Sequence, residues 1–426
     1  MAMISRRKFL TALGAASGAA MVGGAAWGID ASTQRSAPRT QASTSGPLVL
    51  ITLYGGNDGL NTVIPYTDPA YKAARPNLGY DPSVVLAMAD GLGLNPKLTG
   101  VHGLWGQGKL AVVRGVGYPN PNLSHFESMD IWQTANPADG AGTGWLGRWL
   151  DATGTDPMRA LSVGTTLPLA LRGQSQSASA VTATSINVPG GPQFEKPFTL
   201  MQAPGPDRTG LAGQIAGSGN NLIKVKGQLD ALHTHIPSTT GPPTTASTPG
   251  SPSGAGRTRS AGQGTLSASD VTAPLGIVAA LINAGSPARV YQVSLGSFDT
   301  HADEKANQEK LLANLDEGIT SFLDAVAANP AGRNAVLMTY SEFGRRPIEN
   351  ASGGTDHGTA APLFVAGHNV KGGFYGEEPS LTHLDANGNL VFNVDFRSVY
   401  ATVLEKVIGF DSKDVLGGTF PTLGFV

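Results

Sequence analysis

The feature that most constrains the fold is a set of short, continuous apolar runs, each bounded by glycine or polar residues. Apolar runs without alternation are typical of strands buried on both faces of a mostly parallel sheet. The runs lie at residues 48–54, 110–116, 289–295, 335–340 and 362–366. Between the third and the fourth, residues 304–328 repeat leucine, isoleucine and phenylalanine at helical spacing. The sequence therefore predicts an α/β fold with a mostly parallel central sheet flanked by helices.

Composition narrows the function classes. Charged residues make up 14% of the chain and the formal net charge is −2. The chain is therefore a poor candidate for a dedicated nucleic-acid binder, because such proteins need a clustered excess of Lys and Arg. Hydrophobic residues make up 40%, which is enough to build a large core. The chain has no cysteine, so any bound metal must be held by histidine and carboxylate side chains.

The N-terminal segment reads as an export signal. Residues 5–10 (SRRKFL) match the twin-arginine pattern, and an uncharged stretch rich in Ala and Gly follows up to residue 29. Small residues offer cleavage sites near Ala25, Ala26 and Ala31. We expect residues 1–31 to be a signal peptide, with an uncleaved anchor as the alternative. This predicts a periplasmic or secreted protein, with the twin-arginine translocase as partner during export and no stable membrane span after cleavage.

The rest of the chain is predicted to form one domain. Residues 32–47 are polar and read as a tether, and residues 48–426 carry the strand and helix patterns. Residues 237–264 are rich in Pro, Ser, Thr and Gly and are predicted to be a disordered insert, because they cannot bury enough apolar surface to offset their ordering entropy.

Twin-arginine export carries proteins that are already folded, which favours a metalloprotein.

Polar clusters accompany the predicted strands. The first four strands are followed by clusters that contain Asp58, then Ser124 and His125, then Asp299 and His301, then Glu342 and Arg345. A fifth cluster, with His357, precedes the last strand. Ligands of open parallel sheets bind beyond the carboxyl ends of the strands, so the first four clusters are expected to converge at one edge. The fifth has to reach across to join them.

Each cluster also has a plain structural interpretation. Asp58 can belong to an ordinary Asn-Asp-Gly turn, Asp299 and Thr300 can cap the following helix, and residues 356–358 can form a loop turn. Glu342 can pair with Arg345 in a salt bridge, and Ser124 can cap a helix over residues 125–134. Taken together, the clusters hold three of the eight histidines beside acidic or hydroxyl residues, a donor set that suits Zn²⁺, Mn²⁺ or a related divalent ion.

Six motifs in order resemble a known family. GGNDGLNT, SHFESMDIWQT, FDTH, SEFGR, GGTDHG and DFRSVYATVLEKVIG are similar to those of twin-arginine-exported bacterial proteins called domain of unknown function 1501. That family is grouped with alkaline phosphatases, sulfatases and cofactor-independent phosphoglycerate mutases. The resemblance covers about residues 48–409 apart from the insert, and it implies an alkaline-phosphatase-like three-layer sandwich with a metal site.

The resemblance also assigns roles to individual residues. It implies a metal-binding Asp58 after the first strand, a nucleophilic Ser124 at the start of a helix, and metal ligands Asp299, His301 and His357. The Asp-His pair usual in the superfamily is replaced here by Glu342-Phe343. Because a phenyl ring cannot bind metal, one divalent ion (Zn, Mn, Ca or Mg) on Asp299, His301 and His357 is expected in preference to two. A second ion would use Asp58 and Glu342.

Two functions follow from the resemblance. The first is an exported metal-dependent hydrolase of phosphate or sulfate esters, acting on a small-molecule or polymer ester by in-line displacement. In it Ser124 is the nucleophile, Arg345 a cationic clamp and His125 a general acid or base. The second is a catalytically degenerate binding or interaction protein of the cell envelope, favoured by Phe343 and by the compressed Asp-Thr-His spacing. A carbohydrate-binding protein ranks below both, because aromatic residues are only 7% of the chain.

Overall fold

The structure, a computed structural model, describes residues 46–426 except 139, 184–185, 203–209 and 234–268. Its centre is a nine-stranded sheet with the order β13-β5-β12-β9-β1-β8-β6-β7, and β14 also pairs with β5. The strands are β1 (Leu48–Leu53), β5 (Leu110–Gly117), β6 (Ala160–Val163), β7 (Ser179–Val181), β8 (Val290–Leu295), β9 (Val336–Tyr340), β12 (Ala361–Ala366), β13 (Gly373–Tyr375) and β14 (Val394–Asp395). In this sheet β12 runs antiparallel to both neighbours, and the other pairings are parallel.

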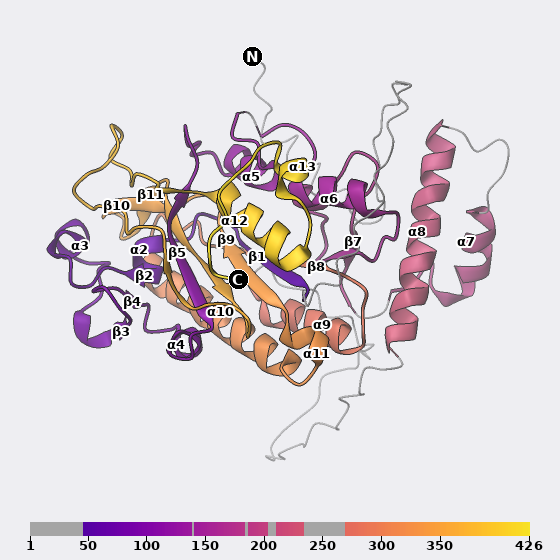
Figure 1. The fold of residues 1–426 in the computed structure, drawn as a ribbon, viewed down its shortest axis with the longest axis horizontal. Coiled ribbons are helices and arrows are strands. Elements are labelled where there is room, and N and C mark those ends of the chain that lie inside the picture. The colour runs from indigo at the N-terminus through magenta and orange to yellow at the C-terminus, as the bar shows by residue number, and fades with distance from the viewer. Residues whose placement is uncertain (1–45, 139, 184–185, 203–209, 234–268) are drawn as a thin grey trace, which may run out of the picture.

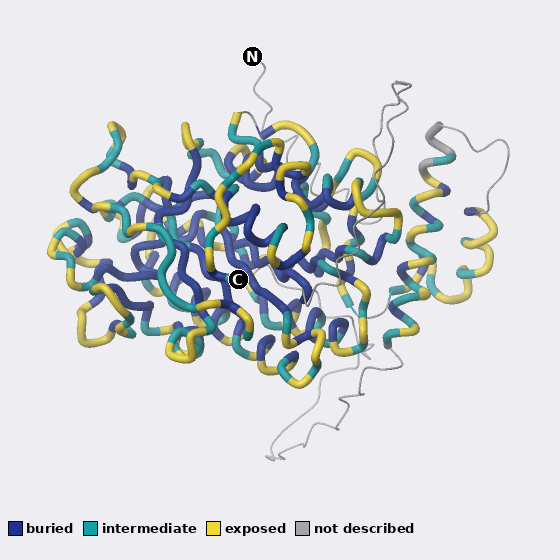
Figure 2. The backbone as a smooth tube through the Cα atoms, in the orientation of Figure 1, coloured by how far each residue is buried: buried dark blue, intermediate teal, exposed yellow. Residues whose placement is uncertain are grey.

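The sheet is the middle of three layers (Figures 1 and 2). Every residue of β1 is buried, and alternate side chains enter different cores because successive residues of a strand point to opposite faces. Val49 and Ile51 pack into the core shared with α4 (Thr99–Gly106), α9 (Thr272–Asn283) and α10 (Glu304–Val326). Leu48 and Leu50 pack into the core shared with α5 (His125–Thr134), α6 (Trp145–Thr153), α12 (Phe396–Thr402) and α13 (Ser412–Leu416).

Smaller elements surround the layers. A three-stranded sheet, β2 (Val63–Ile64), β3 (Leu86–Ala87) and β4 (Gly93–Leu94), accompanies α2 (Gly59–Thr62) and α3 (Pro69–Ala74). The pair β10 (Arg345–Glu349) and β11 (Thr355–His357) connects β9 to β12. The remaining helices are α7 (Glu195–Met201), α8 (Gly210–His233), α11 (Pro330–Arg333), the 3₁₀ turns Pro82–Val84, Leu169–Leu171 and Pro192–Phe194, and a π-helical turn, Val403–Ile408, after α12.

The predicted fold class is confirmed. All five predicted strands form within a residue or so of their expected bounds, and the long helix spans Glu304–Val326. Residues Ser179–Val181 form β7, the strand at one edge of the sheet. Strands from both sides of residues 234–268 share the sheet. The predicted signal (1–31), the insert (237–264) and all but two residues of the tether (32–47) lie outside the described residues.

None of the helices in the described part of the chain is both long and apolar enough to cross a membrane.

Candidate functional site

The polar clusters meet at one edge of the sheet because of the direction of β12. The loops that carry His125, Asp299 and Glu342 follow the carboxyl ends of β5, β8 and β9. β12 is antiparallel to β5 and β9, so its beginning lies at the same edge as their ends. The preceding strand β11, which carries His357, is thereby delivered to that edge. The fifth cluster joins the others without a long crossing.

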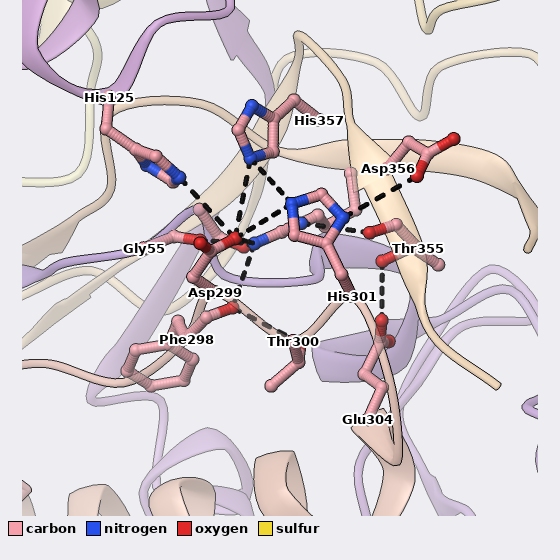
Figure 3. Close-up of polar contacts among 12 residues, drawn as sticks. Gly55, His125, Phe298, Asp299, Thr300, His301, Glu304, Thr355, Asp356 and His357 are labelled. Carbon is pink, nitrogen blue, oxygen red and sulfur yellow. Dashed lines mark hydrogen bonds and ion pairs between the residues drawn. The ribbon is translucent and has the colours of Figure 1, made fainter. Parts of the chain in front are cut away.

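Three side chains aim donor atoms at one place. Nε2 of His125 and Nε2 of His357 each lie 3.4 Å from Oδ1 of Asp299 (Figure 3). Each of the three residues offers a ligand atom that lies within 4.8 Å of those of the other two. A divalent ion bonded at about 2.0–2.1 Å to a tetrahedral set separates its ligand atoms by about 3.4 Å. The spacing of both imidazoles from the carboxylate therefore matches that of ligands around one ion.

His301 lies at the open side of this group. Its Nε2 lies 3.0 Å from Nε2 of His357 and 3.1 Å from Oδ1 of Asp299, and its side chain is 46% exposed. Nδ1 of the same ring faces Oδ1 of Asp356 at 3.5 Å. His301 thus contacts two members of the group, while His125, expected as an acid or base, occupies a donor position.

The protonation of the two inner imidazoles fits a cation. Nδ1 of His357 lies 2.8 Å from the carbonyl oxygen of Leu123, which can only accept, so Nδ1 carries the hydrogen and Nε2 is bare in the neutral ring. Nδ1 of His125 likewise bonds Oε1 of Glu342 at 2.8 Å. Nε2 of His125 is buried and has no hydrogen-bond partner among the described residues. In the neutral rings, the lone pairs of these two Nε2 atoms face the Asp299 oxygen and are repelled by its negative charge unless a cation lies between them. This donor set therefore fits a divalent metal.

The ionisation of the group follows from its neighbours. The hydrogen bond that His125 donates to Glu342 raises the pKa of His125, whereas burial lowers the pKa of His357 and favours its neutral, ligating form. Burial would raise the pKa of Asp299, but the hydrogen bond and the charge of Arg345 hold that pKa below its ordinary value. At neutral pH the group therefore offers an ionised carboxylate beside a neutral imidazole.

Arg345 is a buried anchor. Its side chain is 0% exposed, and one terminal nitrogen donates to Oδ1 of Asp299 at 2.9 Å. The guanidinium also donates to the backbone carbonyl oxygens of Gly55, Gly56, Phe298 and Thr355. These bonds connect the loops after β1 and β8 to the start of β11. The structure therefore places Arg345 behind Asp299, where it holds the carboxylate and presents no surface to a substrate.

Asp58 belongs to a different arrangement. Both of its carboxylate oxygens bond the guanidinium of Arg75, and both side chains are 0% exposed. Asp58 also accepts from the backbone N–H of Leu60 and so caps α2. Among the described residues, the group that could hold a metal does not include Asp58. The structure thus does not bring Asp58 and Glu342 together as ligands of a second ion.

Glu304 is a buried acid that sequence reasoning treated only as the start of a helix. It is fully buried at the start of α10, accepts from the hydroxyl of Thr355, and adjoins Asp58. Burial, followed by the charge of Asp58, raises the pKa of Glu304 to about 9. In the sequence, Glu304 is marked only by its position three residues after His301. This position does not indicate that the side chain is buried.

This pKa predicts a pH-dependent stability. Between its ordinary value near 4.5 and about 9, the folded protein keeps a proton on Glu304 that the unfolded chain releases. Stability therefore falls as pH rises through this window, by at most ~1.4 kcal/mol per pH unit. A Glu304→Gln variant is expected to lose less stability than wild type between about pH 5 and about pH 8, as measured by urea unfolding. Glu317→Gln, an exposed position on the same helix, is the control. Parallel pH profiles for wild type and Glu304→Gln would contradict the buried-acid assignment.

Ser124 stands at the entrance of α5 beside the group. It is half-buried with extended backbone, and its hydroxyl makes no capping hydrogen bond to the described helix. The backbone N–H of Ser124 instead donates to Oδ1 of Asn122 at 2.8 Å. The adjoining residue Leu123 supplies the carbonyl that holds His357. Ser124 therefore follows a residue that contacts the group, and its hydroxyl does not cap the helix.

Phe343 forms an apolar wall. Its ring centroid lies 4.9 Å from that of His125 and 4.7 Å from that of His357, and the residue is buried. The ring packs closely over Gly56, where an added Cβ would lie 2.5 Å from the phenyl ring. Phe343 therefore fixes the orientation of both imidazoles and fills the space beside them without offering a ligand.

Comparison with known proteins gives one family match. A family model described as "Protein of unknown function (DUF1501)" matches residues 110–420. No curated protein matches the sequence. The match covers most of the chain, and its description assigns no reaction, so the reaction has to be inferred from the site.

Several solved structures show a distant likeness. Ps i-CgsB, solved in complex with k-i-k-neocarrahexaose, has a TM-score of 0.37 at 9% identity and covers 88% of this chain and 73% of its own. A 2-O GAG sulfatase has a TM-score of 0.28 at 10% identity and covers 77% and 65%. A protein from Bacteroides thetaiotaomicron, provisionally described as a sulfatase, has a TM-score of 0.29 at 11% identity and covers 77% and 66%. The chain thus spans about two thirds to three quarters of the length of these structures.

Proposed function

The chain belongs to the DUF1501 family of proteins of unknown function, as its motifs predicted, and we propose that it is a metal-dependent hydrolase of phosphate or sulfate esters. The observation that carries the proposal is the convergence of His125, Asp299 and His357 on one point, with the second nitrogen of each imidazole already bonded to the protein. Fixed rings with bare inner nitrogens are what a divalent ion requires. The class of substrate comes from the family resemblance.

In this proposal the site holds one ion. His125, Asp299 and His357 are the inner donors, and His301, half-exposed and within 3.1 Å of Asp299, is a fourth at the open side. Arg345 holds the Asp299 carboxylate in place, and Phe343 keeps water from the back of the two rings. Such an ion supplies Lewis acidity, which neutralises ester oxygens and lowers the pKa of a nearby hydroxyl.

Ser124 is the proposed nucleophile. Its oxygen attacks phosphorus or sulfur in line with the leaving oxygen, the new bond forms as the ester bond breaks, and the departing alcohol takes up a proton. Water then hydrolyses the seryl ester and restores the hydroxyl. The position of Ser124 beside Leu123, whose carbonyl holds His357, supports this role.

The proposal predicts a separation of metal binding from turnover. Ser124→Ala is expected to bind the same amount of metal as wild type but to lose at least about 10³-fold in turnover, because the covalent route is removed. Metal content is measured by mass spectrometry, and turnover on aryl phosphate, phosphodiester and sulfate esters. Ser83→Ala, a surface serine, is the control. Equal rates for Ser124→Ala and wild type would eliminate Ser124 as nucleophile.

A second candidate is a catalytically degenerate binding protein of the cell envelope. The burial of Arg345 favours this candidate. The charge of its guanidinium acts to lower the pKa of all three inner donors, but its side chain is 0% exposed and cannot reach a substrate anion. This candidate predicts metal binding by wild type with no turnover on any ester of the panel. Turnover that disappears in the Ser124→Ala variant would exclude it.

A further inference from the structure

Glu342 is buried beside the candidate site and is fully engaged. Its side chain is 2% exposed, and Oε1 accepts from the backbone N–H of Gly55 at 2.8 Å and bonds Nδ1 of His125 at 2.8 Å. Oε2 accepts from the hydroxyl of Ser341 at 3.0 Å. Gly55 follows β1 and Ser341 follows β9, so the carboxylate is fixed by two neighbouring strands of the sheet.

The position of Glu342 relative to the His125 ring separates it from the metal donors. Glu342 bonds Nδ1, whereas Asp299 faces Nε2 of the same ring at 3.4 Å. The N–H bond at Nδ1 and the lone pair at Nε2 point to different sides of the ring, so an ion bound at Nε2 lies across the ring from Glu342. Oε1 already receives two N–H groups, which leaves it a poor ligand for a second ion.

From this arrangement we propose that Glu342 is a positioning residue that sets the tautomer and orientation of His125, so that the site takes a single divalent ion. The inference rests on the metal site proposed above. As an acceptor, the Glu342 carboxylate keeps the hydrogen on Nδ1 and leaves Nε2 bare toward Asp299. Carboxylates behind ligating histidines commonly tune metal affinity in this way.

Two substitutions at Glu342 separate its charge from its shape. Glu342→Leu removes the acceptor and is expected to weaken Zn²⁺ binding by roughly 10- to 100-fold while the stoichiometry stays at one ion per chain. Glu342→Gln keeps an amide oxygen for Gly55 and His125 and is expected to bind more tightly than Glu342→Leu. Affinity and stoichiometry are measured by calorimetric titration of the full chain with Zn²⁺.

A matched control tests whether any buried carboxylate has this effect. Asp316 is buried and accepts from the backbone N–H groups of Gly100 and Val101 at 3.0 and 2.7 Å, far from the site in the fold. Asp316→Asn is expected to lower thermal stability and leave Zn²⁺ affinity unchanged.

Wild type that binds two ions, with one lost in the Glu342 variants, would overturn the proposal by making Glu342 a ligand. Equal Zn²⁺ affinity in wild type and Glu342→Leu would also overturn it.

A spectroscopic readout on metal-free protein keeps this inference distinct from the proposed function. At alkaline pH, where the ring is neutral, nitrogen NMR of ¹⁵N-histidine-labelled protein is expected to show His125 with its hydrogen on Nδ1 in wild type and in both tautomers in Glu342→Leu. The same tautomer in both proteins overturns the positioning role. Failure of wild type to bind any divalent ion overturns the proposed function, and this NMR comparison still decides the role of Glu342.

Discussion

Replacing Asp299 with alanine is expected to weaken divalent-metal binding by about two to three orders of magnitude and to lower any metal-dependent turnover with it. His125, His301 and His357 all approach Oδ1 of Asp299, at 3.1–3.4 Å, and Arg345 also holds this oxygen. If a binding energy of about 10–16 kcal/mol is shared equally among four donors, losing one costs about 2.5–4 kcal/mol, which is two to three orders of magnitude in affinity. Calorimetric titration with Zn²⁺ and metal analysis of the purified variant measure this loss.

The neighbouring carboxylate Asp356 is the matched control. Its side chain is 59% exposed and faces Nδ1 of His301 at 3.5 Å. Asp356→Ala is expected to change Zn²⁺ affinity by less than about tenfold, because it removes only an exposed contact behind one donor. Equal losses in Asp299→Ala and Asp356→Ala would show that local acidity, and not the convergence on Asp299, attracts the metal.

The second large effect concerns stability. Arg75→Met is expected to lower the free energy of unfolding by about 3–5 kcal/mol, because it leaves the Asp58 carboxylate buried without its counter-charge. Both side chains are 0% exposed, and Arg75 also donates to the backbone carbonyls of Arg346 and Pro347. Burial would raise the pKa of Asp58, and the charge of Arg75 keeps that pKa below its ordinary value. Urea unfolding measures the change.

A double substitution identifies the cause. Asp58→Asn combined with Arg75→Met removes both charges, and Asn still caps α2. The double variant is therefore expected to be more stable than Arg75→Met alone. Its Zn²⁺ stoichiometry is expected to equal that of wild type, because Asp58 is not in the converging group. A double variant as unstable as the single one would attribute the loss to the two carbonyls that Arg75 holds.

Local sequence patterns predicted the framework because each of them depends on a few neighbouring residues. The apolar runs became buried strands, and the periodic segment became α10, since burial of an apolar face is encoded by residue spacing alone. The same logic placed His125, Asp299 and Glu342 after strand ends. Family motifs extended this to His357, and all four residues occur at the candidate site.

Other assignments depended on partners that local patterns do not reveal. Arg345 was expected to meet a substrate, and the structure buries it beneath Asp299. Asp58 was expected to bind an ion, and its partner is Arg75, a residue with no distinguishing motif. In both cases the sequence identified a charged residue correctly. The residue that it pairs with depends on how the loops pack, which local patterns do not contain.

By itself, the sequence determined the α/β class, the positions of the main strands and which chemical groups lie at their ends, because hydrophobic periodicity and strand polarity are local properties. Only the tertiary structure decided that β12 runs antiparallel and brings His357 to the edge where the other strands end. It also decided that Glu342 bonds His125, 217 residues away along the chain. Hydrogen bonds and ion pairs between such distant residues depend on the packed arrangement of the whole sheet, which no local window of the sequence contains.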